Sequence, residues 1–401
     1  MNVFIITAVP FPFGMAPTNR IKCYAKALIE EGVNCKVLCF RRTELVSNTQ
    51  RDGTHEGVPY HYIGRKSIRP HNKILGILID VFDHVHLLLF LLCHLQKNDI
   101  VFSYGSTLHY GNMIIAVAHL KGGVFVRDLV EIPNVTSNDT LHQQHVRRAE
   151  LERQFPRYDG VIAISSALKN MAEKHIGKSD SVLKIPILVD YDKYCLEDKS
   201  DEFETPFVFH SGTLSDQKDG FSGMIEAFGK AVCHINKTIH FISTGHLEQS
   251  PQKEKIKGLI QNYHLEDKLM FTGYLSDKEL KNYLMKASLV IINKNRTEQN
   301  EYCFSTKLGE YMAAGKPVII TRMGEAVNWL TDKEDVLFVE PENTEQLSEA
   351  ITELFSNKTL RKSIANNARI TCKKSFDYHN YGRTIVNFFN NLINKNIHDN
   401  K

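Results

Sequence analysis

The sequence predicts an α/β protein with two doubly wound, Rossmann-like domains that face each other across a cleft. Short runs that are apolar throughout alternate with helical stretches, a pattern typical of parallel sheets covered by helices on both faces. The alternation stops in a polar connector at residues 190–205 and then restarts. A chain of 401 residues also has the length expected of two domains, which we place at residues 1–189 and 206–376.

The N-terminal domain begins with an apolar strand and continues in strand–helix order. The first helix ends at Gly32, since glycine readily takes the left-handed conformation that follows a helix. Strands are expected at Val3–Thr7, Cys35–Phe40, Ile100–Tyr104, Val124–Arg127, Val161–Ile164 and Val182–Ile185. Helices are expected at Asn19–Glu31, Leu108–Leu120, His142–Phe155 and Ala167–His175.

The C-terminal domain repeats the same order, and it ends in an amphipathic helix at Tyr378–Asn394. Strands are expected at Phe207–Phe209, Ile239–Ser243, Leu269–Thr272, Leu289–Ile292 and Pro317–Thr321. Helices are expected at Gly220–Val232, Gln252–Tyr263, Asp277–Met285, Thr306–Ala314, Thr344–Phe355 and Leu360–Lys374. In such sheets ligands bind at the carboxyl ends of the strands, so the chemistry should lie in loops that face the cleft.

Composition excludes several classes of protein. Hydrophobic residues make up 42% and charged residues 24% of the chain, as in ordinary globular proteins. The net charge of +3 gives no sign of nucleic-acid binding. The eight cysteines form no CxxC pair and no zinc-like spacing. We therefore expect reduced thiols, no metal site and a cytoplasmic protein, and Asn2–Val9 lacks the features of a secretory signal.

The longest apolar stretch, Ile74–Leu95, is the one segment that raises the question of a membrane. It contains Asp80 and Asp83, so we do not expect it to span a bilayer. Two interpretations remain open: a core helix, or a helix whose apolar face touches a membrane surface. Partial support for the second comes from basic residues that lead into the stretch, namely Arg41, Arg42, Arg65, Lys66, Arg69 and Lys73.

The segment Asn300–Thr321 is the most informative loop. Ser305 and Thr306 stand where the N-cap of a helix belongs, and the unpaired N–H groups there can bind an anion. Glu310 follows Thr306 at i, i+4 spacing, and its carboxylate can accept hydrogen bonds from the vicinal hydroxyls of a ribose. A phosphate beside a diol is the outline of a nucleotide. The alternative is that Ser305 only caps the helix and Glu310 is solvated.

Two further loops have shapes that suit a phosphate. In Phe209–Gly220 a strand is followed by Gly212 and then by Lys218 just before a helix. In the first loop, PFPFGMAPTNR, Gly14 permits close backbone approach of a ligand. This loop is not GxGxxG, so no dinucleotide cofactor is indicated.

Together these loops resemble the family 4 retaining glycosyltransferases of the GT-B architecture. The strongest match is FSTKLGEYMAAGKPVI at Phe304–Ile319, which is similar to the nucleotide-sugar motif of that family. Supporting matches are SGTLSDQKD at Ser211–Asp219, FTGYL at Phe271–Leu275, DGVIAIS at Asp159–Ser165 and the opening loop. The resemblance implies that the C-terminal helix, residues 377–395, packs back on the N-terminal domain.

The resemblance also implies roles for individual residues. Glu310 would hold the donor ribose, the amides of Ser305 and Thr306 would cradle the distal phosphate, and Lys218 would pair with the diphosphate and stabilise its departure. The remaining donor-binding candidates are Gly14, Gly212, Tyr274, Tyr302 and Phe304. The catalytic candidates beside Lys218 are Glu301 and Glu131.

The sequence departs from the family pattern at two positions. The acidic residue usually found eight positions before Glu310 is Tyr302 here, with Glu301 adjacent, and the arginine that often follows the loop glycine is Thr213. A nearer subgroup carries Ser-x-Lys-x-x-Glu at this place. Donor contacts, and therefore the sugar, can differ from those of the wider family.

The expected activity is metal-independent, retaining transfer of a sugar from a nucleoside diphosphate sugar, with UDP as the expected nucleotide. The acceptor would be the hydroxyl of a sugar or lipid-linked sugar, in bacterial surface polysaccharide or glycolipid assembly at the inner face of the plasma membrane. No cofactor and no nucleic acid are expected. One alternative is a nucleotide-sugar epimerase or hydrolase that uses Asp128 and Glu131 as acid and base, and another is a catalytically silent nucleotide-binding scaffold.

Overall fold

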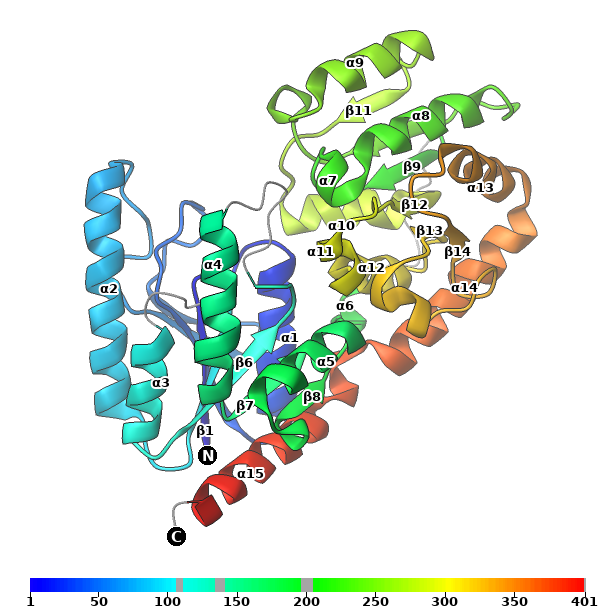
Figure 1. Ribbon diagram of the computed structural model, residues 1–401. Helices are drawn as coiled ribbons and strands as arrows, with labels where there is room; N and C mark the ends of the chain where they lie inside the picture. Colours follow the sequence, from blue (N-terminus) through cyan, green and yellow to red (C-terminus); the bar gives the residue numbers. More distant parts are fainter. Residues whose placement is uncertain (106–110, 134–140, 196–204, 400–401) are drawn as a thin grey trace. The chain divides into compact units, whose positions relative to one another are not determined.

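The computed structural model describes residues 1–105, 111–133, 141–195 and 205–399 (Figure 1). The chain forms two compact units, Met1–Val189 with Tyr378–Lys401, and Asp190–Asp377. The polar connector expected at residues 190–205 is not separate in its described part. Residues 190–195 belong to the second unit, and Asp192–Cys195 form the short helix α6. The rest of the expected connector, residues 196–204, lies outside the described residues.

The first unit is built on an eight-stranded sheet with the order β3-β4-β2-β1-β5-β6-β7-β8. All neighbouring strands are parallel except β3 and β4, which form an antiparallel pair. The strand order reverses beside β1, so the sheet is doubly wound as predicted. Its strands are β1 (Asn2–Thr7), β2 (Asn34–Cys39), β3 (Asp52–His55), β4 (Val58–Tyr62), β5 (Ile100–Tyr104), β6 (Val124–Leu129), β7 (Gly160–Ala163) and β8 (Val182–Lys184).

The β3–β4 hairpin is absent from the sequence prediction. Its turn is made by Glu56 and Gly57, both with positive φ (47° and 80°), which is the geometry of a tight two-residue hairpin turn. Residues in β3 are exposed or half-buried, because this strand lies at the sheet edge. An edge strand without an apolar run gives little periodic signal, and this is why the hairpin was missed.

Helices cover both faces of the first sheet, and the last one comes from the end of the chain (Figure 1). From α15 the side chains of Ile385, Phe388, Phe389 and Leu392 enter the core of this unit. Tyr378, just before α15, donates a hydrogen bond from its hydroxyl to Glu30 at 2.7 Å. The helices are α1 (Ala16–Glu30), α2 (Lys73–His94), α3 (Gly111–Leu120), α4 (Leu141–Ala149), α5 (Ser166–Ile176) and α15 (Gly382–Asp399).

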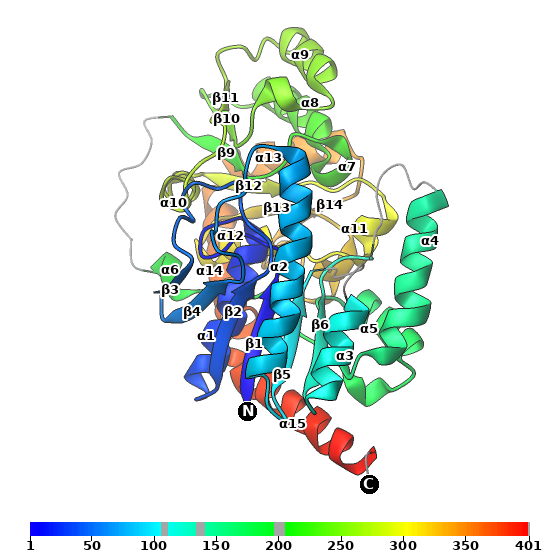
Figure 2. The same cartoon turned by 90° about the vertical axis from the view of Figure 1, so that its left-hand side faces the viewer.

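Helix α2 is not a core helix, which corrects one of the two interpretations of its apolar stretch. Only Gly76, Asp83, Leu87 and Leu91 are buried along its 22 residues. Figure 2 turns its outer side toward the viewer, and none of the described helices and strands of the first unit lies in front of it.

In the second unit, the described residues form a parallel six-stranded sheet with the order β11-β10-β9-β12-β13-β14. The order reverses between β9 and β12, so this sheet is doubly wound as well. Its strands are β9 (Phe207–His210), β10 (His240–Ser243), β11 (Leu269–Phe271), β12 (Leu289–Ile292), β13 (Val318–Thr321) and β14 (Leu337–Val339). Only β14, a three-residue edge strand, is absent from the prediction.

The helices of the second unit pack their apolar faces on this sheet. Phe221, Met224 and Phe228 of α8 are fully buried in its core, beside Ile351 and Leu354 of α13. The helices are α7 (Asp216–Asp219), α8 (Phe221–Val232), α9 (Lys253–Asn262), α10 (Asp277–Lys286), α11 (Glu298–Tyr302), α12 (Thr306–Ala313), α13 (Thr344–Ser356) and α14 (Lys358–Ser375). The short helices α7 and α11 fall in loops where the sequence predicts no element, and both flank the site described next.

Candidate functional site

Polar side chains gather at the carboxyl ends of β9, β10 and β12, where the strand order of the second sheet reverses. His210 ends β9, Ser243 ends β10, and Asn293 with Lys294 follows β12 directly. The reversal separates the loops that leave neighbouring strands and opens a crevice in which doubly wound proteins bind ligands. The second unit therefore carries its candidate site at this edge.

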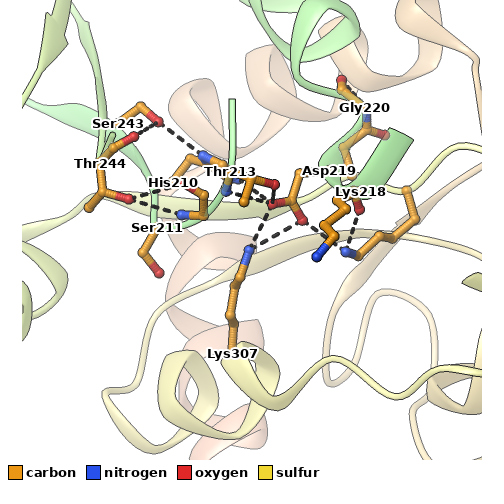
Figure 3. Close-up of polar contacts among 12 residues, drawn as sticks. His210, Ser211, Thr213, Lys218, Asp219, Gly220, Ser243, Thr244 and Lys307 are labelled. Atoms are coloured by element: carbon orange, nitrogen blue, oxygen red, sulfur yellow. Dashed lines mark hydrogen bonds and ion pairs between the residues drawn. The ribbon is translucent and has the colours of Figure 1, made fainter. Parts of the chain in front are cut away.

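The buried carboxylate of Asp219 is the centre of the site (Figure 3). It ends α7, and two lysines from other elements reach it. Lys294 Nζ lies 2.8 Å from Oδ1, and Lys307 Nζ, from the first turn of α12, lies 3.2 Å from Oδ1 and 3.1 Å from Oδ2. One carboxylate thus holds two ammonium groups that lie 75 and 88 positions from it in the sequence.

The loop after β9 completes the surroundings of Asp219. The backbone N–H and the hydroxyl of Thr213 both donate to Oδ2 at 2.9 Å. Burial alone would raise the pKa of Asp219, but Lys307 and Lys294 hold it well below its ordinary range. Burial, with Lys307 nearby, lowers the pKa of His210 to about 3, so this imidazole is neutral. The cluster therefore contains one negative and two positive charges.

This imbalance leaves Asp219, Lys294 and Lys307 with one positive charge in excess, which Glu310 partly offsets. The side chains of Lys294 and Lys307 are 15% and 23% exposed, so both ammonium groups are held in place yet reachable by a ligand. Burial lowers the pKa of Lys307, and the charge of Asp219 opposes that shift. An anion that approaches the two lysines would neutralise the excess charge and favour the protonated form of Lys307.

Because Gly212 has no side chain, there is space beside it for the contact between Lys307 and Asp219. A Cβ at this position would collide with Lys307 Nζ and would lie 2.5 Å from Asp219 Oδ2 and 2.8 Å from His210 Nε2. These distances are far below van der Waals contact. The absence of a side chain at Gly212 is therefore a requirement of the charge cluster itself.

Three asparagines hold α7 and the residues around it. Asn293 Nδ2 donates to the carbonyl of Gly220 at 2.9 Å, and Asn295 Nδ2 donates to the carbonyl of Asp216 at 3.0 Å. Asn300 Nδ2 reaches the carbonyls of Asn295 at 2.9 Å and Gln217 at 3.5 Å. Because amide side chains satisfy the backbone of this loop, its position is set before any ligand binds.

Helix α12 begins beside the cluster. Ser305 occupies its N-cap position with extended backbone angles, and its side chain makes no capping hydrogen bond. Further along the same helix, the hydroxyl of the buried Tyr311 accepts a hydrogen bond from Ser211 N at 2.9 Å and ties α12 to the loop after β9. The first N–H groups of α12 and its Lys307 thus lie at the same end of the helix, where its dipole also favours an anion.

The second unit matches a known protein family. Residues 197–371 match the family model described as glycosyl transferases group 1, which covers nearly all of the second unit. An uncharacterized glycosyltransferase of Methanocaldococcus jannaschii is 26% identical over 260 residues, 63% of this chain and 67% of that protein. Other curated relatives are matched over 34–63% of their own length.

Solved structures match over almost the whole chain. HepE of Anabaena, in a complex with UDP and glucose, superimposes with a TM-score of 0.72 at 16% identity, covering 98% of this chain and 100% of that one. Sucrose-phosphate synthase from Thermosynechococcus elongatus gives a TM-score of 0.70 at 17% identity, covering 98% and 99%. The chain has the GT-B fold. Together with the family match, these likenesses support a GT-B glycosyltransferase.

Four residues predicted from the sequence lie at the charge cluster or on its loops: Gly212, Lys218, Ser305 and Thr306. The side chain of Lys218 is exposed, and its backbone carbonyl accepts a hydrogen bond from Lys294 Nζ at 2.5 Å. Glu310 is half-buried one turn into α12 and acts electrostatically on Lys307. The phosphate and ribose roles of these residues stay predictions.

The second unit also contains four other site residues predicted from the sequence: Tyr274, Glu301, Tyr302 and Phe304. Tyr274 is 63% exposed and follows Gly273, which pairs with Gly245 in an isolated bridge. Glu301 is exposed and Tyr302 half-buried on α11. Phe304 is buried against Trp329 and Phe376, so a donor contact from it would come from its backbone.

Gly14 and Glu131 belong to the first unit and are not members of the cluster. Gly14 is buried, and a Cβ there would collide with the Thr18 hydroxyl, so internal packing already requires glycine. Glu131 is exposed just after β6. Asp128, the proposed partner of Glu131 in an epimerase, is buried inside β6 in an ion pair with Arg20.

Sequence reasoning missed three members of the site: Asp219, Lys294 and Lys307. A signal existed for Lys307, because it is the lysine of the Ser-x-Lys-x-x-Glu pattern. Asp219 follows Lys218 directly in the chain, and Lys294 follows a predicted strand. Within the described ranges, no group of three or more histidine, cysteine or acidic side chains is arranged to hold a metal ion.

Proposed function

We propose that this protein transfers a sugar from a nucleoside diphosphate sugar to a hydroxyl acceptor, with retention of the anomeric configuration and without a metal ion. UDP is the nucleotide we propose. The observation that carries the proposal is the Asp219 cluster, where two lysines meet one carboxylate beside the N-terminus of α12. This arrangement supports the binding of a diphosphate.

The same groups suit the chemical step. When the bond between sugar and diphosphate breaks, negative charge grows on the leaving phosphate. Ammonium groups of Lys294 and Lys307, and the N–H groups that begin α12, are placed to stabilise a charge that develops there. In a retaining reaction of this kind the departing phosphate itself can take the acceptor proton. The proposal therefore needs neither a metal ion nor a carboxylate base.

The choice of UDP has support from similar proteins. HepE of Anabaena, whose fold matches over nearly the whole chain, has been solved with UDP and with UDP-glucose. For the acceptor we propose the hydroxyl of a sugar or of a lipid-linked sugar. The setting we propose is the assembly of bacterial surface polysaccharide or glycolipid in the cytoplasm, at the inner face of the plasma membrane.

The decisive experiment measures UDP release from UDP-sugars with and without candidate acceptors. We expect release to depend on the acceptor, the new linkage to keep the donor configuration by NMR, and the rate to be unchanged by EDTA. Lys307→Gln should abolish most of the activity, whereas Lys362→Gln, an exposed lysine on α14, should leave it intact. Inversion of configuration would contradict the retaining mechanism.

Two other outcomes would replace the proposal. Release or isomerisation of the donor without any acceptor would indicate the epimerase or hydrolase alternative. That alternative loses support from the first unit, since the Asp128 carboxylate is engaged with Arg20 at 3.1 Å and with the Tyr24 hydroxyl at 2.9 Å. UDP binding with no turnover over a broad panel of donors and acceptors would indicate a silent scaffold.

A further inference from the structure

The outer face of α2 exposes a row of large apolar side chains on the first unit. We use the term outer face for the side of α2 that carries eight exposed apolar residues: Ile74, Leu75, Ile77, Leu78, Val81, Phe82, Val85 and Leu89. Ile74 is 74% and Leu78 is 63% exposed. Their spacing of three and four residues places them on one side of the helix. A continuous apolar row of this size on a surface indicates an interaction site.

The two acidic side chains of α2 point the opposite way, whereas His86 packs on Phe82 of the outer face. Asp83 is buried and accepts from Arg42 at 2.8 Å and 3.1 Å. Asp80 accepts from Arg69 at 2.7 Å. These two are the only acidic residues of the helix, and arginines from preceding loops neutralise both. The helix thus turns its acidic groups toward the protein and leaves its outer face without one.

Basic residues flank the outer face at both ends. Lys73 begins the helix and is exposed, and so are Arg65 and Lys66 in the segment before it. Lys97, also exposed, follows the C-terminal end. The neighbouring helix α3 adds Met113 and Leu120, which are 55% and 76% exposed. The whole surface is therefore apolar in the middle and positive at its ends.

The helix is fixed to the unit along its inner side. Leu87 and Leu91 are fully buried, and Phe90 packs edge-on against Phe4 of β1 with ring centroids 6.2 Å apart. In the described part of the chain, α2 is the one helix long and apolar enough to cross a bilayer. Spanning would require breaking its ion pairs with Arg42 and Arg69 and drawing the sheet into hydrocarbon. If α2 lies along the bilayer surface, its ion pairs stay formed and the sheet stays out of the hydrocarbon.

We infer that the outer face of α2 docks on the surface of an anionic lipid bilayer, with α2 parallel to the membrane plane. Charge decides between this occupant and a second copy of the chain. Two copies packed through the same face would bring Lys73 against Lys73 or against Lys97, with no acidic partner for either. An anionic lipid surface supplies the opposite charge at both ends and an apolar medium between them.

The test is co-sedimentation of the full chain with vesicles of phosphatidylcholine, alone or mixed with phosphatidylglycerol. We expect binding to the mixed vesicles that weakens as salt is raised. The double variant Ile77→Gln, Leu78→Gln should reduce the partition coefficient at least ten-fold. Arg65→Gln and Lys66→Gln should each reduce it about five-fold, the equivalent of about 1 kcal/mol per basic residue.

Matched controls come from the second unit. Met270→Gln with Ile370→Gln removes two exposed apolar side chains, and Lys358→Gln with Lys362→Gln removes two exposed lysines. Neither pair should change binding. The inference is overturned if the protein stays in the supernatant with both kinds of vesicle at low salt, or binds both equally. It is also overturned if the Ile77, Leu78 variant abolishes a concentration-dependent dimer in sedimentation equilibrium.

This inference does not rest on the proposed sugar transfer. UDP titration of the same samples reports on the Asp219 cluster alone. A variant that loses vesicle binding but binds UDP normally therefore distinguishes membrane docking from nucleotide binding. Circular dichroism of each variant confirms that the exposed substitutions leave the fold intact.

Discussion

A buried cluster of opposite charges lies around Arg20 in the first unit and another around Asp219 in the second, and the two are built differently. In the first unit Arg20 and Asp128, both with fully buried side chains, pair at 3.1 Å. The remaining donors of Arg20 reach the carbonyls of Pro186 and Ile185, and Tyr24 donates its hydroxyl to Asp128. The charges balance, one cation to one anion. In the second unit one buried carboxylate faces two partly exposed lysines.

The difference distinguishes a structural ion pair from the ligand site that we propose. Arg20 joins α1 to β6 and to the segment after β8, so its partners are all within the protein and none is left for a ligand. The lysines of the Asp219 cluster carry one charge more than their partner can neutralise. Burial alone therefore says little about function. Charge balance and access say more.

The largest effect should follow the loss of Arg20. In Arg20→Met the carboxylate of Asp128 stays buried without its cation, and we expect the free energy of unfolding to fall by about 3–5 kcal/mol. Urea unfolding, with hydrogen exchange to resolve the two units, measures this loss in the first unit. The double variant Arg20→Met, Asp128→Leu should recover part of it. An unchanged urea midpoint for Arg20→Met would contradict the structural role.

Lys307→Gln and Lys294→Gln should do the reverse, with little change in stability and a large change in affinity. Each would remove a charge-assisted contact to the diphosphate that we propose as ligand, at a cost of about 1.5–3 kcal/mol, or ten-fold to more than a hundred-fold in the Kd for UDP. Isothermal titration calorimetry measures both variants against Lys362→Gln. If they bind UDP as tightly as the wild type, the cluster is a second structural ion pair.

Glu310 offers a sharper test, because its predicted partner is the ribose and not the phosphate. Glu310→Gln should weaken UDP binding by about 1.5 kcal/mol, roughly ten-fold, while the affinity for inorganic pyrophosphate stays as it is. Lys307→Gln should weaken both ligands. Equal losses for UDP and pyrophosphate in Glu310→Gln would show that this carboxylate acts through Lys307.

The smallest expected effect is a dependence of UDP affinity on alkaline pH. Burial lowers the pKa of Lys307 below 10.5, and only the protonated amine attracts a phosphate. Affinity should therefore fall a few-fold as pH rises through this lowered pKa, and Lys307→Gln should lose this dependence. Burial lowers the pKa of Arg20, but Asp128 and Tyr24 raise it by more. The Arg20 cluster should therefore stay charged over the same pH range. Calorimetry and urea unfolding at rising pH compare the two.

Strands that are buried on both faces could be predicted from the sequence almost to their ends, as β5 at Ile100–Tyr104 and β12 at Leu289–Ile292 show. Their apolar runs are the direct consequence of burial. The β3–β4 hairpin and β14 lie toward sheet edges and escaped prediction because they have short or mixed runs.

For the site residues, prediction from the sequence was limited by contacts between distant parts of the chain. Ser305 could be found because a helix N-cap is a local backbone requirement, and Gly212 because a glycine shortly after a predicted strand is visible in the sequence. The pairing of Asp219 with Lys307 could not, since 88 positions separate the two residues and only the tertiary fold brings them together. Lysine and aspartate are ordinary surface residues when they are considered one at a time.

The asparagines that hold α7 have a thermodynamic consequence. Asn293, Asn295 and Asn300 fix the backbone of Asp216, Gln217 and Gly220 in the absence of any ligand. A preorganised loop loses little conformational entropy when a nucleotide arrives, so less of the interaction energy is consumed in ordering the chain. The heat capacity change of UDP binding should then reflect the ligand's own contact area, without the additional contribution of a loop that folds around it.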